Sequence, residues 1–189
     1  SMQTMLKFSR AIDALSERLG WLSMMLVILT VAIGFYNVAA RYIGRFIGMQ
    51  LSSNGFIETQ WYLFSLVFFL NFAYILKHGI NVRVDFIFSR WSKRRKALLD
   101  FCGHILFLLP YSILGIWVTI NPVIASWTQW EMSPDPGGLP RAPIKAVIIL
   151  AFVMLLLQTI SELIKLWATI QGQEIVIEEF EIDTPLRIE

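Results

Sequence analysis

Four long apolar runs dominate this sequence and leave few folds open to it. They lie at about residues 21–42, 57–76, 98–120 and 143–167, and each has the length of a membrane-crossing helix, roughly 20 to 25 residues. Such a helix crosses a hydrocarbon core about 30 Å thick with some tilt. A water-soluble domain of 189 residues could not bury four such runs. The sequence therefore predicts an all-α integral membrane protein with four transmembrane helices.

The distribution of charge predicts the orientation of these helices. Three of the 16 Lys and Arg residues lie before the first run, seven lie between the second and third runs, and two, Lys165 and Arg187, lie at the end of the fourth run and beyond it. The remaining four are Arg41, Arg45, Arg141 and Lys145. The positive-inside rule places the larger group, and both chain ends, in the cytoplasm. We therefore expect a cytoplasmic segment at 1–20, a transmembrane domain at 21–168 and an acidic cytoplasmic tail at 169–189.

The connecting segments predict short interfacial, amphipathic elements. Phe86, Ile87, Phe88 and Trp91 precede the basic run 93–96, a pattern that favours a helix lying on the cytoplasmic lipid surface. A plain solvated basic loop is the alternative. Tryptophans prefer the membrane–water boundary, so the expected interfacial anchors are Trp91, Trp127 and Trp130.

Prolines and one cysteine add local expectations within the spans and loops. Residues 133–140 are too rich in proline and glycine to form a helix, and Pro110 is expected to kink the third span. The single cysteine, Cys102, excludes an intramolecular disulfide and is expected to be a small buried apolar residue.

Polar side chains inside the spans are the candidates for structural or partner contacts. Arg41 ends the first span and Glu58 begins the second, where the two could pair or could each reach water. The other candidates lie nearer the cytoplasmic ends of spans two, three and four: Asn71, Asp100, His104, Gln158 and Glu162. Asp100 and His104 share one helix face, as do Gln158 and Glu162. We expect these groups to hydrogen-bond between helices.

Charged residues are absent from the middle third of every predicted span. An ion-coupled carrier places its coupling site near the membrane midplane, between repeats and broken helices, and this sequence has neither. Motifs of hydrolases, zinc proteases and nucleotide-binding loops are also absent, so neither an enzyme nor a cofactor is expected. His78 and His104 leave one alternative open, a haem held between spans two and three.

Several ordered motifs resemble the small membrane subunit, of the DctQ type, of tripartite ATP-independent periplasmic (TRAP) transporters. Asn37 to Tyr42 closes the first span with an arginine, and Glu58 to Phe64, which includes Gln60, opens the second with a glutamate. Asn81-Val82-Arg83-Val84-Asp85 matches a stretch that the family usually begins with histidine. Ser133 to Pro140 leads into Pro143 to Ala146, and Leu157 to Glu162 ends the fourth span. The resemblance covers about residues 10–170, and the tail after Gly172 has no counterpart.

The resemblance implies a role as well as a fold. It implies a non-catalytic scaffold subunit in the bacterial inner membrane, packed against a large elevator-type permease. A periplasmic binding protein would deliver an organic acid, which a sodium gradient would drive inward. Gln60, Arg83 and Asp85 join the candidates for partner contacts or structural roles; Arg83 and Asp85 would point to the same side of an extended segment. The alternative is a stand-alone four-helix membrane protein, either a small exporter or a haem-binding electron carrier.

Overall fold

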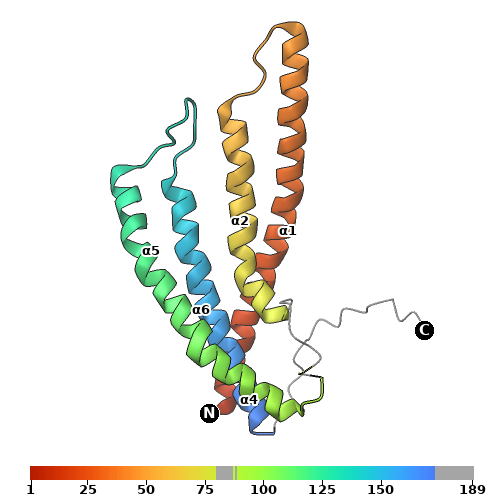
Figure 1. Cartoon of the computed structure of the whole chain (residues 1–189), viewed down its shortest axis with the longest axis vertical. Coiled ribbons are helices and arrows are strands. Elements are labelled where there is room, and N and C mark those ends of the chain that lie inside the picture. Colours follow the sequence, from red (N-terminus) through yellow and green to blue (C-terminus); the bar gives the residue numbers. More distant parts are fainter. Residues whose placement is uncertain (80–86, 88, 173–189) are drawn as a thin grey trace, which may run out of the picture.

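The computed structural model describes residues 1–79, 87 and 89–172. Its helices are α1 (Met2–Ile47), α2 (Asn54–His78), α4 (Lys93–Gly103), the π-helical turn η1 (His104–Leu108), α5 (Leu109–Gln129) and α6 (Ala142–Ile170) (Figure 1). Because α4, η1 and α5 follow one another without a break, Lys93–Gln129 forms one helical stretch of 37 residues. The described part of the chain thus holds four helices long and apolar enough to cross a membrane, which confirms the predicted fold class.

Helix α6 lies at the centre of the packing. It contacts α1, α2, α4 and α5, while α1 packs mainly against α2. The ring of Phe152 on α6 lies 5.8 Å from that of Tyr111 on α5 and 6.4 Å from that of Phe72 on α2. A Cβ atom at Gly115 would lie 2.4 Å from the Phe152 ring, so only glycine allows α5 to approach α6 this closely.

Both ends of the bundle are defined by helix boundaries. Gly48 and Gly79 adopt left-handed conformations, with φ of 69° and 62°, and end α1 and α2. Loops 48–53 and 130–141 lie at one end, hereafter the loop end, and residues 2 and 172 lie at the other, hereafter the terminal end (Figure 1). As the sequence predicted, no helix forms over 133–140.

Helix α1 is much longer than the first predicted span. Its 46 residues, at about 1.5 Å per residue, give a length of roughly 69 Å, more than twice the thickness of a hydrocarbon core. The predicted span at 21–42 lies inside it, and residues 2–20 continue the same helix. In this extension Ser9 and Ser16 are buried, with 1% and 0% of their surface exposed.

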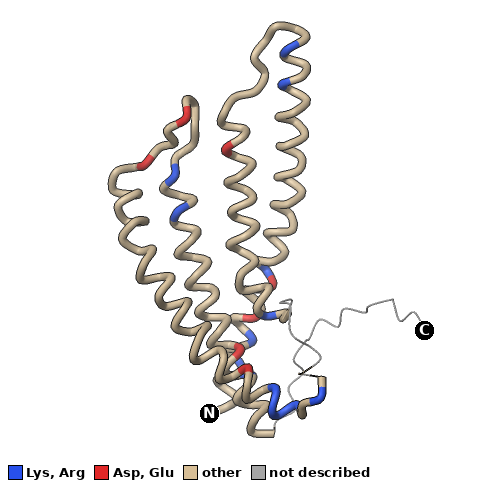
Figure 2. Tube along the Cα trace, viewed as in Figure 1, with Lys and Arg blue, Asp and Glu red and all other residues tan. Residues whose placement is uncertain are grey.

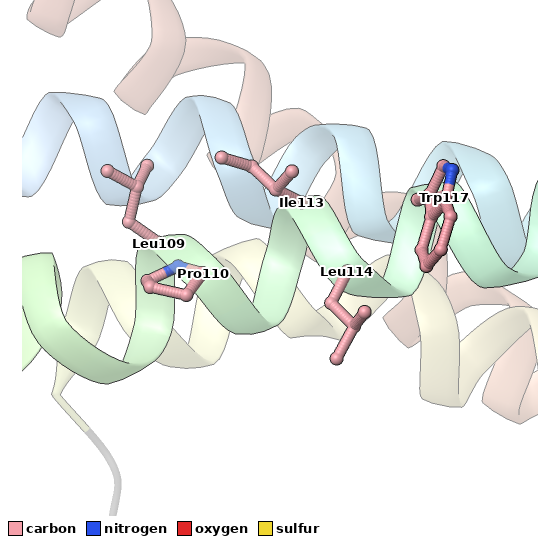
Figure 3. A pocket seen from close by; sticks show the side chains of 5 residues that line it. All are labelled: Leu109, Pro110, Ile113, Leu114 and Trp117. Carbon is pink, nitrogen blue, oxygen red and sulfur yellow. The ribbon is translucent and has the colours of Figure 1, made fainter.

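The third span has an irregular turn in its first half, and its cysteine lies on the outer surface of the bundle. The sequence predicted a kink at Pro110. In the turn just before this proline, η1 widens the helix to π geometry. Beside it, Leu109, Pro110, Ile113, Leu114 and Trp117 line a shallow apolar hollow on α5 (Figure 3). The prediction that Cys102 is buried was wrong, since its side chain is exposed. In a membrane-spanning helix an outward-facing apolar residue contacts lipid. An apolar residue such as cysteine therefore suits the lipid-facing surface as well as the protein interior, and its type does not predict burial.

Candidate functional site

A buried polar cluster joins α1 to α6 at the terminal end. This α1–α6 cluster consists of Ser9, Asp13, Ser16, Gln158, Ser161, Glu162 and Lys165. Ser16 Oγ donates to Gln158 Oε1 at 2.6 Å, and Gln158 Nε2 lies 2.9 Å from both Asp13 Oδ1 and Glu162 Oε1. The Oγ atoms of Ser9 and Ser161 are 2.6 Å apart. Gln158 is fully buried, and its amide uses both its donor and its acceptor groups here.

Lys165 supplies the positive charge of this cluster. Its Nζ lies 2.9 Å from Asp13 Oδ2 and 2.9 Å from Glu162 Oε1. The side chains are 12%, 16% and 10% exposed, in the order Lys165, Asp13, Glu162. Two carboxylates therefore share one ammonium group in a poorly hydrated site. Such a group is costly to disrupt, because removal of one partner leaves a buried charge without its counterion.

Three further contacts, made by Glu17 and Ser23, connect α1 to α2. Glu17 Oε1 lies 2.9 Å from Lys77 Nζ and 2.7 Å from His78 Nε2. About a turn and a half further along α1, Ser23 Oγ donates to Asn71 Oδ1 at 2.8 Å. Asn71 thus bonds between helices, as the sequence predicted, with Ser23 of α1 as its partner.

At the loop end, Glu58 holds loop 130–141 against the start of α2. Its carboxylate accepts a hydrogen bond from the backbone N–H of Leu139 at 2.6 Å and another from the Ser133 hydroxyl. Glu58 is 2% exposed. Tyr62, one turn further along α2, donates from its hydroxyl to the Pro140 carbonyl at 2.9 Å. These bonds make Glu58 the centre of a contact between the two halves of the bundle.

Arg41 has a separate set of contacts at this end. Its Nε atom donates to Asn37 Oδ1 at 3.3 Å, and the Asn37 amide donates to Gln60 Oε1 at 3.2 Å. Neither arrangement that the sequence left open holds for Glu58: within the described part of the chain it forms no ion pair with Arg41, and its buried carboxylate bonds to loop 130–141 and does not reach water. Gln60 therefore contributes to α1–α2 packing.

A second acidic residue stabilises the loop itself. Glu131 accepts hydrogen bonds from the ammonium group of Lys145 and from Ser126 Oγ, the latter at 2.8 Å. The Lys145 and Ser126 bonds favour the ionised carboxylate and hold the pKa of Glu131 below its ordinary value of 4.5. Arg141 lies over the Trp61 ring, 5.9 Å from the ring centre, in the range of a cation–π contact.

The remaining sequence candidates have mixed positions. Gln158 bonds between helices, to Ser16 and Asp13 on α1, and also bonds Glu162 on its own helix. His104 Nδ1 bonds the backbone carbonyl of Asp100 on its own helical stretch, at 2.7 Å. The Trp127 and Trp130 rings form an edge-to-face pair 5.5 Å apart, and Trp91 is exposed. Arg83 and Asp85 lie outside the described residues, as do Phe86 and Phe88 of the proposed surface helix. Residues 89–92 form a turn and a bend, and the basic run 93–96 begins α4, which continues into the third span. His78 lies on α2 with its Nε2 atom 2.7 Å from Glu17 Oε1, and His104 lies on η1.

Sequence reasoning missed Ser9, Asp13, Ser16 and Lys165. Ser9, Asp13 and Ser16 precede the first apolar run, and Lys165 lies at the end of the fourth. Charged residues are common at such places for reasons of topology alone, so they do not indicate a buried contact. A spacing signal does exist, because residues 9, 13 and 16 repeat at intervals of four and three and so share one helix face. Residues 158, 161, 162 and 165 do the same on the fourth span.

The fold and these contacts define an all-helical protein with four candidate membrane-spanning helices, joined by polar groups near both ends of the bundle. Across the described helices, charged residues lie toward the ends and the central segments are free of them (Figure 2). Residues 30–169 match the family model of the tripartite ATP-independent periplasmic transporters, DctQ component. The chain therefore belongs to this family, the small membrane subunit of TRAP transporters. In TRAP systems this subunit works with the large DctM subunit and a substrate-binding protein.

The comparisons with curated proteins and with solved structures gave no significant match. The matched range includes the α6 half of the α1–α6 cluster and omits its α1 half, since Ser9, Asp13 and Ser16 precede residue 30. The family assignment thus rests on the membrane-spanning core, and the contacts of the α1 extension come from the structure alone.

Proposed function

We propose that this chain is the fixed, non-catalytic scaffold of a sodium-coupled TRAP transporter that imports an organic acid. It packs against the large subunit in the bacterial inner membrane, and the terminal end faces the cytoplasm. The large subunit carries the substrate and sodium sites, and the periplasmic binding protein delivers the substrate at the loop end. The chain contributes surface and rigidity rather than a binding site.

One observation carries this proposal: within the described helices, polar contacts fix both ends and the middle has no charged group. Residues 19–40, 59–76, 101–129 and 146–161 contain no Asp, Glu, Lys or Arg. A sodium-coupled carrier needs an ion site near the midplane, commonly formed by broken helices. Meanwhile the α1–α6 cluster joins α1 to α6 and Glu58 joins α2 to loop 130–141, contacts that support one rigid body.

The outer surface of α1 supports the packing part of the proposal. Large apolar side chains are exposed along it, including Ile28 at 72%, Phe35 at 77% and Phe46 at 88%. Phe46 lies in the last turn of α1, four residues beyond the end of the predicted first span at residue 42. An apolar side chain in that position favours contact with a partner protein.

Reconstitution in liposomes with an inward sodium gradient tests the proposal. Four preparations are compared: this chain alone, the large subunit alone, both together, and both with the binding protein. Uptake of a panel of labelled organic acids should require the complete set. Sodium-driven uptake by this chain alone would contradict the scaffold assignment, and full uptake without it would show that it is dispensable.

A further inference from the structure

The start of α4 carries an exposed concentration of positive charge. Arg90, Lys93, Arg94 and Arg95 are all exposed, and Lys96 is half-buried. Figure 2 shows a run of basic residues in blue at the start of α4. No acidic residue lies in the first turn of α4. The structure shows no hydrogen bond or ion pair for these five side chains within the described part of the chain. Their charge is therefore available to an external anion.

An exposed apolar stripe continues directly from these cations toward the membrane interior. Arg95 is followed at helical spacing by Leu99, Cys102 and Leu106, all of them exposed. The eleven helical steps from Arg95 to Leu106 correspond to roughly 16 Å along a helix, about the hydrocarbon thickness of one leaflet. When Leu106 lies near the midplane, Arg95 is thus at the level of the lipid headgroups.

We propose that this basic turn, Arg90 and Lys93 to Lys96, binds the phosphate groups of anionic phospholipids in the adjoining leaflet. The stripe contacts the acyl chains of the same lipids, while the cations bind their phosphates by charge-assisted hydrogen bonds. Trp91, 38% exposed, lies beside the cations and suits the same boundary. The inference needs only the membrane location of the helices, so it can fail or hold independently of the transport role.

Cys102 is a built-in probe for this site, because it is the only cysteine of the chain and lies on the stripe. A fluorophore on Cys102 reports contact with lipids that carry a spin-label quencher. The labelled protein is reconstituted in vesicles of equal parts phosphatidylcholine and phosphatidylglycerol, with the quencher on one lipid or the other. We expect stronger quenching by labelled phosphatidylglycerol, lost at high salt because screening weakens the contact.

Matched variants assign the effect to the basic turn. Arg94→Gln with Arg95→Gln should lower the preference by about fivefold for each cation that contacts a lipid. Lys7→Gln with Arg10→Gln removes the same amount of charge from exposed positions on α1 and should leave the preference for phosphatidylglycerol unchanged. Equal quenching by the two lipids in the wild type, or equal loss in both variants, would overturn the proposal.

Two other occupants are resolved by the same assay. A chain ending at Gly172 lacks the acidic residues of the C-terminal tail. A preference that appears only in this shortened chain would show that the tail, and not lipid, occupies the basic turn. Labelled protein assembled with the large subunit should keep its preference; loss on assembly would show that the partner covers the turn, and would overturn the proposal for the working transporter.

Discussion

Replacement of Lys165 by methionine should destabilise the protein strongly, because Lys165 is the only cation in the α1–α6 cluster. Its ammonium group lies 2.9 Å from both Asp13 and Glu162, and all three side chains are less than a fifth exposed. Methionine fills much of the same space without the charge. The buried carboxylates of Asp13 and Glu162 would then have no counterion. Loss of one partner of a buried ion pair costs about 3 kcal/mol or more, roughly a hundredfold in the folding equilibrium.

Reversible unfolding of the purified chain in mixed detergent and denaturant measures this loss. Lys145→Met is the matched control, since Lys145 also pairs with a carboxylate but is 35% exposed, and exposed pairs contribute little. A triple variant, Asp13→Asn with Glu162→Gln and Lys165→Met, should regain much of the lost stability because no uncompensated charge remains. If Lys165→Met and Lys145→Met were equally mild, the reasoning about buried charge would be wrong.

Three further predictions concern the loop end. Gly138→Ala should destabilise the loop by about 1–3 kcal/mol. The added Cβ would lie 2.4 Å from Ser133 Cβ and 2.9 Å from Glu58 Oε1. Gly103→Ala is the control, because a Cβ at Gly103 would meet no atom within 4 Å. The depressed pKa of Glu131 means that its bonds to Lys145 and Ser126 stabilise the loop above pH 4.5 and weaken as pH falls through the folded pKa. Proteolysis of the loop should rise in that acidic window, and Glu131→Gln should remove the dependence. Asp135→Cys, in a Cys102→Ser background, should react with impermeant reagents only from outside sealed cells; labelling from the cytoplasm would reverse the proposed orientation.

Hydropathy alone predicts the four spans because a bilayer imposes one length and one polarity on every crossing segment. The positions of Gln158 and Glu162 also follow from sequence, since a separation of four residues places both on one helix face. These features depend on local geometry, which a single helix carries within itself.

Partners across helices do not follow from local geometry. Asp13 and Lys165 are 152 positions apart, and their contact depends on how far α1 extends past the membrane and how closely it approaches α6. Glu58 illustrates the same difficulty. The sequence suggested Arg41, at the end of the neighbouring span, as its partner. In the structure the Glu58 carboxylate instead accepts hydrogen bonds from the backbone N–H of Leu139 and from the Ser133 hydroxyl. A buried carboxylate needs donors, and backbone donors are not visible in a list of charges.

A covalent link between α1 and α6 tests the scaffold claim most directly. The Oγ atoms of Ser9 and Ser161 are 2.6 Å apart and buried, so cysteines at both positions, with Cys102→Ser, should form a disulfide. The oxidised variant is assembled with the large subunit and the binding protein, and sodium-driven uptake is compared before and after reduction. A fixed scaffold predicts the same uptake rate in both states. Uptake that stops on oxidation and returns on reduction would show that α1 and α6 move apart during transport, and would contradict the account.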